Sequence, residues 1–239
     1  MPDVNITCRG TVAVVTMNQG ENRFHPAFIE NLLAAMDRVE ADTSIRALVV
    51  TSIHEKVFSN GLDLDWLAPR IQREDLQPVK AFFYRLNDLF RRILTYPMVT
   101  FAAISGHAFG AGAIFSCAFD FRTMREDRGF FCLPEVDLGI PFLPGMNALL
   151  ERAVPRHKLT EMQLSGLRLT GAECLDHHIV SAVFSAETLL EQTRALAESF
   201  NKKRAAVAEI KRRAAAPIVR ALDLDDVPYI ESGDYHLPA

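Results

Sequence analysis

The spacing of apolar residues predicts strands alternating with helices in the first half of the chain. One β-branched run, residues 45–53, is nearly all apolar at its centre, which is typical of a strand covered on both faces. Between such runs, apolar side chains recur at three- and four-residue spacing, which predicts amphipathic helices. This alternation favours an α/β core. The predicted strands span residues 11–18, 45–53, 98–106 and 120–124, and the predicted helices begin after Pro26 and span residues 78–94.

From Gly145 onward the pattern is mostly helical, with one short strand predicted at residues 179–184. After Ala221 the chain is acidic and its apolar positions follow no clear period. We therefore expect an α/β core in residues 1–190, followed by a helical assembly region and tail in residues 191–239. The predicted helices of this half span residues 146–154, 158–165, 172–177, 186–201 and 204–216.

Composition indicates a globular protein and argues against several classes of partner. The chain has 239 residues, 49% hydrophobic and 23% charged, which is enough for an apolar core. The net charge is −4 and no long basic run is present, so we expect no nucleic-acid partner. No apolar run reaches about 18 residues. No signal peptide or terminal address is recognisable either, so we expect no membrane contact and a cytoplasmic location. The four cysteines have neither metal-site nor disulfide-framework spacing, which favours reduced thiols.

Three glycines gather where the third predicted strand gives way to a helix. The stretch reads "SGHAFGAGAIFSCAFD" and contains Gly106, Gly110 and Gly112. It has no lysine, so it is not a P-loop. Phe115 stands where the dinucleotide fingerprint needs its last glycine, so that motif is absent too. What remains is a turn that lets a ligand touch bare backbone, beside helix amides that lack an internal partner.

A second glycine turn, "FSNGLD" at residues 58–63, also follows an apolar strand. One exposed amide from each turn would form a two-donor hole for a carbonyl oxygen, and such donors stabilise a developing oxyanion. Two ordinary tight turns would give the same sequence pattern. Spacing alone leaves both interpretations open.

Three motifs in order carry a resemblance to a known family. "FSNGLDL", then "SGHAFGAG" and then "PEVDLGI" resemble the crotonase, or enoyl-CoA hydratase/isomerase, superfamily, and the resemblance runs from "GENRF" to "LTGAECLDHHIVSAVF". It implies a crotonase-like spiral of ββα units with a C-terminal helical region. It also implies acyl-CoA thioester substrates and a homotrimer or dimer of trimers. No metal and no separate cofactor are expected, because coenzyme A is part of the substrate.

The resemblance also assigns roles to individual residues. It places the backbone N–H groups of Leu62 and Ala111 in the oxyanion hole. The family segment that lines coenzyme A corresponds to residues 22–24, so Arg23 and Phe24 become candidate contacts. Further candidates for substrate contact are Ser59, Asn60, Gly61, Asp63, Gly110, Ile114, Phe142 and Leu143.

The available carboxylates distinguish between family reactions. Family hydratases use two glutamates, and the position of the first is Ile114 in this chain, whereas the second is Glu135. An aspartate found in some dienoyl isomerases corresponds to Leu143. A single carboxylate among apolar residues resembles the Δ3,Δ2-enoyl-CoA isomerases, in which it would move a proton from C2 to C4 of a 3-enoyl-CoA. Burial should raise the pKa of the Glu135 carboxyl.

Two other functions remain open at this point. The chain could be a hydratase, or run another crotonase reaction, with one carboxylate. It could also be a non-catalytic acyl-CoA-binding homologue, for which Ile114 is the best support. Asp137 would face the same way as Glu135 if the segment were extended, although a turn or an intersubunit ion pair suits it better. We expect His107 to be packed, and Trp66, Phe82, Phe83 and Phe90 to be core or walls of an acyl tunnel. The short, acidic end of the chain leaves the family's usual C-terminal contacts in doubt.

Overall fold

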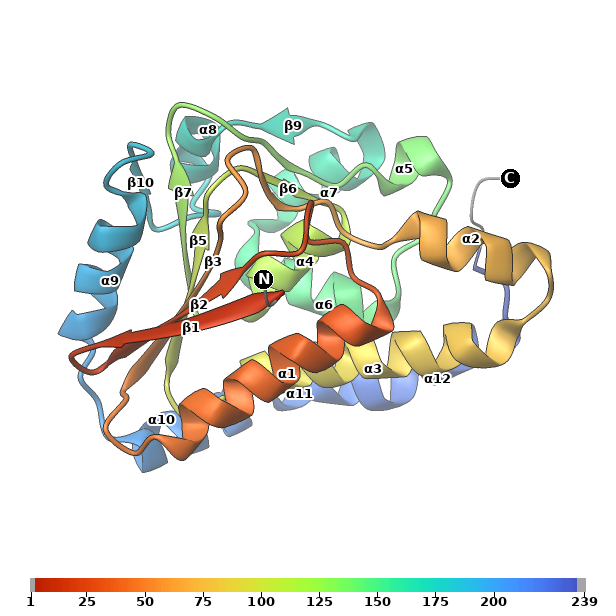
Figure 1. The fold of residues 1–239 in the computed structure, drawn as a ribbon. Coiled ribbons are helices and arrows are strands. Elements are labelled where there is room, and N and C mark those ends of the chain that lie inside the picture. The colour runs from red at the N-terminus through yellow and green to blue at the C-terminus, as the bar shows by residue number, and fades with distance from the viewer. Residues whose placement is uncertain (1–2, 236–239) are drawn as a thin grey trace.

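The computed structural model of the chain describes residues 3–235, which form two sheets surrounded by helices (Figure 1). The larger sheet has six strands in the order β1-β2-β3-β5-β7-β10. Its first pair is an antiparallel hairpin, and all its other neighbouring strands are parallel. Its strands are β1 (Val4–Arg9), β2 (Val12–Met17), β3 (Ala47–Ser52), β5 (Val99–Ile104), β7 (Phe121–Arg125) and β10 (Ala182–Phe184).

A smaller sheet carries the turns that matter for the site. Its order is β4-β6-β8-β9, and β6 is parallel to both β4 and β8. Three times, a strand of the large sheet is followed by a strand of the small sheet and then by a helix. This repetition confirms the expected crotonase-like spiral of ββα units. The small strands are β4 (Val57–Ser59), β6 (His107–Phe109), β8 (Phe131–Cys132) and β9 (Arg168–Leu169).

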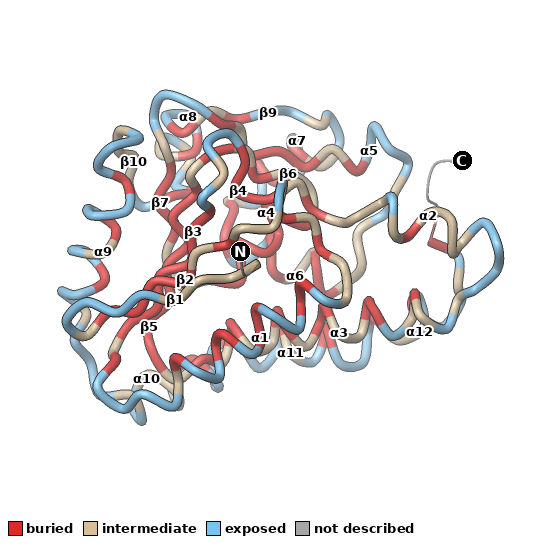
Figure 2. Tube along the Cα trace, viewed as in Figure 1, coloured by how far each residue is buried: buried red, intermediate tan, exposed pale blue. Residues whose placement is uncertain are grey.

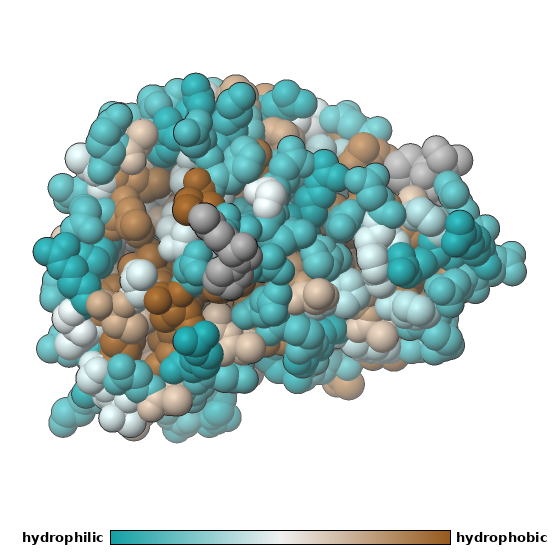
Figure 3. All heavy atoms as spheres, viewed as in Figure 1, coloured by the Kyte–Doolittle hydropathy of each residue, from teal (hydrophilic) through white to brown (hydrophobic). Residues whose placement is uncertain are grey.

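The helices cover both faces of the large sheet. Every residue of α4 is buried, and Figure 2 shows this helix as buried near the centre of the fold. On the other face, α9 packs against β3 and β5 and completes a second apolar cluster around Phe101. In Figure 3 apolar residues reach the surface between the β1–β2 hairpin and α9. The bounds of these two helices and of the first three helices of the chain are α1 (Pro26–Ala41), α2 (Leu64–Gln72), α3 (Leu76–Leu94), α4 (Ala111–Ala118) and α9 (Leu189–Ser199).

The remaining helices follow the predicted pattern, except for α5 (Glu135–Leu138), which was not among the predicted helices, and for the end of the chain. Where the sequence shows no clear period after Ala221, the chain forms a π-helical turn at Ala221–Asp225 and then α12. This segment lies against α3 (Figure 1). The division at residue 190 and the assembly role of residues 191–239 stay predictions. The other helices are α5 (Glu135–Leu138), α6 (Pro144–Ala153), α7 (Arg156–Ser165), α8 (Gly171–Asp176), α10 (Arg204–Ala214), α11 (Ala216–Arg220) and α12 (Val227–Ser232).

No helix within residues 3–235 is both long enough and apolar enough to cross a membrane.

Candidate active site

The two glycine turns lie side by side because β4 and β6 are parallel neighbours. Each strand ends in a turn that leads to a helix, so the turns meet at the same edge of the small sheet. Gly61 has a φ of +79° and Gly110 a φ of +53°, a backbone region that favours glycine. A Cβ added to Gly61 would lie 3.0 Å from the nitrogen of Ala111 and 2.8 Å from the carbonyl oxygen of Phe109. The two backbones are therefore in direct contact.

The N–H groups of Leu62 and Ala111 are the free donors of these turns. Ala111 is the first residue of α4, where an N–H has no acceptor within the helix. In the first turn, the Phe24 N–H donates to the Gly61 carbonyl at 2.7 Å and the Asp63 N–H to the Phe24 carbonyl at 3.0 Å. The Leu62 N–H has no partner among the described residues. Both Leu62 and Ala111 line the same cavity, which brings together the two predicted donors.

Buried hydrogen bonds made by Asn22 and Ser59 fix the conformation of the first turn. Asn22 is fully buried with a φ of +51°, and its side-chain amide donates to the Ser52 hydroxyl at 2.8 Å and the Phe58 carbonyl at 2.9 Å. The Ser59 hydroxyl donates to the Asn22 carbonyl at 2.7 Å and accepts from the Gly61 N–H at 3.2 Å. The Ser59 hydroxyl thus stabilises the turn on the side away from the cavity. Ser59 does not line the cavity, contrary to its predicted role in substrate contact.

Phe24 and Asp63 also lie off the cavity wall. The Phe24 ring is fully buried and packs against Phe28 and Phe115, with ring centroids 5.9 and 5.2 Å away. Asp63 caps α2, where its carboxylate accepts from the Trp66 N–H at 3.2 Å. Neither side chain is placed to touch a ligand in the cavity, because one is occupied by core packing and the other by helix capping.

Close backbone approach explains the third glycine of the second turn. A Cβ added to Gly112 would lie 2.3 Å from the carbonyl oxygen of Ser59. The first turn of α4 therefore packs directly against β4, and a side chain at this position would push the two donor turns apart.

Glu135 stands beside the second turn, at the start of the one-turn helix α5. Its side chain is 9% exposed, and a Cβ added to Gly110 would lie 3.2 Å from its Oε1. The other oxygen, Oε2, is buried and has no hydrogen-bond partner among the described residues. Burial raises the pKa of the Glu135 carboxyl to about 7, partly opposed by a backbone hydrogen bond. A buried carboxyl with one free oxygen is suited to proton transfer near neutral pH.

The helical turn separates Asp137 from Glu135. Residues two apart on a helix do not share a face, so the extended arrangement that would align them is absent. Asp137 is exposed and its carboxylate lies next to Gly166, where an added Cβ would be 2.3 Å from Oδ2. Asp137 is not on the cavity wall.

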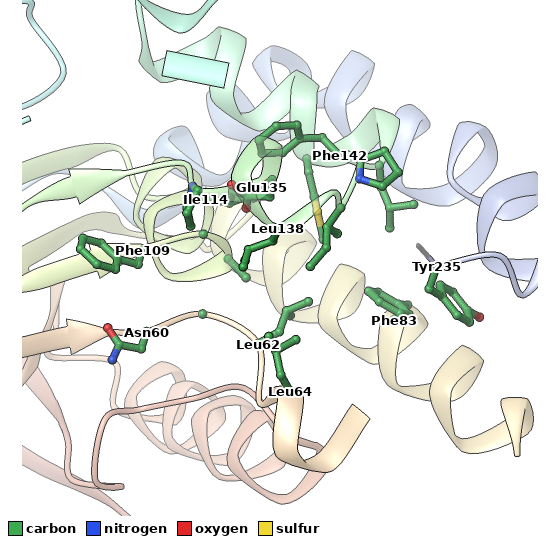
Figure 4. A pocket seen from close by; sticks show the side chains of 18 of the residues that line it. Asn60, Leu62, Leu64, Phe83, Phe109, Ile114, Glu135, Leu138, Phe142 and Tyr235 are labelled. Atoms are coloured by element: carbon green, nitrogen blue, oxygen red, sulfur yellow. The ribbon is translucent and has the colours of Figure 1, made fainter. Parts of the chain in front are cut away.

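The cavity has a volume of about 740 Å³, within the usual range for small-molecule sites. Figure 4 shows Glu135 and Ile114 near its middle, with Asn60 and Phe109 to one side and Phe83 and Tyr235 to the other. Ten of the predicted site residues line it: Arg23, Asn60, Gly61, Leu62, Gly110, Ala111, Ile114, Glu135, Phe142 and Leu143. It is also lined by Leu64, Asp65, Phe83, Phe109, Pro134, Leu138, Ile140, Pro141, Met146, Tyr229, Asp234 and Tyr235.

Two of the three carboxylates on the wall are at its rim. Asp65 pairs with Arg23 at 3.0 Å and its side chain is 89% exposed, and Asp234 is also exposed. Arg23 additionally pairs with Glu21 at 2.5 Å, so two carboxylates already share its charge. Glu135 is the buried carboxylate of the wall.

Sequence reasoning missed the wall residues of the C-terminal segment. Tyr229, Asp234 and Tyr235 lie within the stretch after Ala221 that shows no period, and no local signal links them to a site on α3 and α5. Of the candidate tunnel aromatics, Phe83 lines the cavity, whereas Trp66, Phe82 and Phe90 belong to the apolar core.

His107 is partly buried beside the rings of Phe109 and Phe130, at 5.0 and 5.6 Å. Burial, together with the nearby Arg168 and Arg128, lowers its pKa. It does not line the cavity. No group of three or more His, Cys, Asp or Glu side chains within residues 3–235 is arranged to hold a metal ion.

Comparison with known proteins adds three findings. The family model for enoyl-CoA hydratase/isomerase matches residues 7–225. Enoyl-CoA delta isomerase 3 of Arabidopsis thaliana is 34% identical over 204 residues, covering 82% of this chain and 84% of that protein. A putative enoyl-CoA hydratase of Thermus thermophilus is 32% identical over 197 residues, covering 81% and 76%. The relatives thus carry both reaction names.

Among solved structures, a probable enoyl-CoA hydratase of Mycobacterium tuberculosis has a TM-score of 0.88 over 97% of this chain and 96% of its own. It is 24% identical in sequence, so this likeness bears on the fold.

Proposed function

Because the chain belongs to the enoyl-CoA hydratase/isomerase family, we propose that it moves the double bond of 3-enoyl-CoA esters to the 2-position. Glu135 is the base in this reaction, and the N–H groups of Leu62 and Ala111 hold the thioester oxygen. The observation that carries the proposal is the arrangement of Glu135. It is a buried carboxylate beside the paired donors, and the position of the hydratases' other glutamate is the apolar Ile114.

The reaction needs one proton carrier and an oxyanion site. The Glu135 carboxylate takes a proton from C2, and the electron pair of that C–H bond passes into a dienolate whose charge rests on the thioester oxygen. The two backbone N–H groups and the positive end of α4 stabilise this charge. The Glu135 carboxyl then returns the proton to C4, the double bond settles between C2 and C3, and the carboxylate is restored. No external acid or base is consumed.

The environment of Glu135 favours this shuttle over hydration. Its pKa of about 7 leaves both protonation states accessible near neutral pH, as a group that accepts and then returns a proton requires. Hydration would need a water molecule to be held and activated at the alkene. Ile114 offers no polar group for that water, so the wall supports transfer within the substrate.

A pair of substrates tests the proposal directly. The wild-type protein should convert 3-enoyl-CoA to the conjugated 2-enoyl ester and form little 3-hydroxyacyl-CoA from 2-enoyl-CoA, both followed by chromatography of the esters. Glu135→Gln should lower kcat by about 10³-fold, within the range for loss of a general base, while acyl-CoA binding is retained.

Asp137→Asn is the matched control, since it changes an exposed carboxylate of the same short helix. It should leave the rate unchanged. Fast formation of 3-hydroxyacyl-CoA would favour the hydratase instead. Acyl-CoA binding without turnover of either ester would favour a non-catalytic homologue.

A further inference from the structure

The cavity has two chemically different ends. At one side of Glu135 lie Asn60, the ring of Phe109 and, on the rim, the Arg23–Asp65 ion pair. On the other side the wall is apolar up to the rings of Phe83 and Tyr235 (Figure 4), and the exposed Tyr229 and Asp234 of the same C-terminal segment lie on the cavity rim. The apolar wall between them is formed by Leu62, Leu64, Leu138, Ile140, Phe142, Leu143 and Met146.

This asymmetry orients a thioester ligand. If the carbonyl oxygen is held by the N–H groups of Leu62 and Ala111, the polar coenzyme A portion leaves toward the polar end. The hydrocarbon chain then lies along the apolar wall, because apolar surface gains free energy when it leaves water. The chain therefore runs toward Phe83 and Tyr235.

The rings of Phe83 and Tyr235 stack on each other at that end of the cavity. Phe83, from α3, and Tyr235, from the C-terminal segment, stack with centroids 5.0 Å apart and planes 19° apart. They are 6% and 8% exposed. The Tyr235 hydroxyl donates to the carbonyl oxygen of Ile230 at 2.8 Å, so the polar atom of the side chain is satisfied within its own segment. What Tyr235 adds to the cavity is an aromatic ring.

Polar contacts fix the C-terminal segment to α3. The Lys80 ammonium donates to both the carbonyl and the carboxylate of Glu231 at 2.9 Å, and the Tyr84 hydroxyl donates to that carboxylate at 2.8 Å. Deeper in the interface, Asn87 donates to the fully buried Asp226 at 2.8 Å. These contacts hold the segment that carries Tyr235 against α3, which carries Phe83.

We propose that the stacked Phe83–Tyr235 pair closes the acyl end of the cavity and sets the greatest length of acyl chain that the site accepts. This inference rests on the proposed acyl-CoA function. The substrates are esters with a straight chain whose terminal methyl group contacts the two rings, and longer chains collide with them.

The test is a series of straight-chain 3-enoyl-CoA esters of increasing length. For the wild type, the specificity constant kcat/KM should rise with chain length and then fall once the chain exceeds the limit. Tyr235→Ala and Phe83→Ala open the end from opposite sides. Each should raise kcat/KM for esters beyond the limit, relative to the shortest ester, by about tenfold or more, since one or two methylenes in an apolar pocket are worth that much.

Three further substitutions distinguish the effect of the Tyr235 ring from that of its surroundings. Tyr235→Trp should move the limit to shorter chains, and Tyr235→Phe, which keeps the ring, should leave the limit in place. Tyr84→Phe removes a tether of the C-terminal segment without touching the cavity wall, so it controls for loosening of that segment. It should keep the wild-type length profile.

Calorimetric binding of saturated acyl-CoA esters gives a second readout that needs no turnover. If affinity shows a length limit that Tyr235→Ala extends, the inference holds even where no double-bond shift is catalysed. If the limit is the same in wild type, Tyr235→Ala and Phe83→Ala, or if Tyr84→Phe moves it equally, the ring pair is not the stop. Absence of any acyl-CoA binding would overturn both the inference and the proposed function.

Discussion

Ionisation of Glu135 works against the stability of the fold. The folded-state pKa is about 7, above the ordinary value of 4.5, because burial disfavours the charged form. Below about pH 4.5 the carboxyl is protonated in both states and carries no penalty. As the pH rises toward 7 the unfolded chain ionises first, so the penalty grows, and above about pH 7 it is constant.

Glu135→Gln should therefore stabilise the protein at about pH 8, where its free energy of unfolding should exceed that of the wild type by about 3 kcal/mol. At about pH 4.5 most of this gain should be absent. Urea denaturation at the two pH values measures both differences. Equal stability of the two proteins at the higher pH would contradict the assigned pKa.

The spacing of the two donor turns depends on Gly61 as well as on Gly112. A side chain at Gly61 would meet the Ala111 nitrogen and the Phe109 carbonyl oxygen, and both are backbone atoms that cannot turn aside. Gly61→Ala should displace the Leu62 donor and lower kcat by about 10²–10³-fold, the usual effect of losing one oxyanion donor.

Gly20→Ala provides the matched control for Gly61→Ala. Gly20 also has a positive φ, +50°, but an added Cβ would have nothing within 4 Å. Both variants carry the backbone cost of a positive φ, about 1 kcal/mol, so a comparison of their steady-state rates isolates the collision. Equal rates for the two variants would remove Gly61 from the oxyanion site.

At the scale of elements, the short strands of the small sheet position the two glycine turns of the site. The parallel pairing of β4 with β6 brings together two turns that are about fifty positions apart in the chain, and Asn22 ties β4 to the end of β3 through Ser52 and Phe58. The sequence predicted five of the six strands of the large sheet, but not β1 at its edge. It did not predict β4, β6 and β8 as strands, because runs of two or three residues show no period.

Asn22→Ala should destabilise the junction of the two sheets. It removes the Asn22 donor from the Phe58 carbonyl, and an unpaired buried group costs about 1–3 kcal/mol. It also removes one of two donors to the Ser52 hydroxyl, which keeps the His54 N–H at 3.0 Å, and it places Ala at a φ of +51°. Thermal unfolding measures the loss. Asn31→Ala, which removes one exposed hydrogen bond to Asp3, should change the unfolding temperature little.

At the scale of the whole molecule, the end of the chain completes the cavity. Tyr235 stacks on Phe83 although about 150 positions separate them in sequence, and Tyr229 lines the same cavity. The acidic tail gave no periodic signal because its docking depends on isolated residues, with Asp226, Ile230 and Tyr235 buried among more exposed neighbours. Such a pattern is not distinguishable from an irregular tail without the α3 surface that receives it.

Assembly as a homotrimer or dimer of trimers stays a prediction. Several large apolar side chains around α5 and α7 are exposed in the single chain, including Val136 at 45%, Leu164 at 74% and Leu167 at 36%. Burying such residues between chains would be favourable. Light scattering coupled to gel filtration should give the mass of three or six chains, and Leu164→Glu should reduce it. A single-chain mass for the wild type would contradict the prediction.

Sequence alone indicated most of the helices, five of the six strands of the large sheet and the two glycine turns, because apolar periodicity and backbone freedom are local properties. The family resemblance singled out Glu135. It also placed ten of the wall residues through their motifs. Tertiary structure decided which candidates face the cavity. Ser59 hydrogen-bonds to Asn22, Phe24 packs in the core and Asp63 caps α2, so none of the three faces the cavity. Phe83 and Tyr235, in contrast, stack at its far end. The Asp63 cap is local, but the contacts of Ser59, Phe24, Phe83 and Tyr235 join segments that are distant in sequence, so only the folded chain fixes them. The burial that raises the pKa of Glu135 is likewise a property of the folded chain.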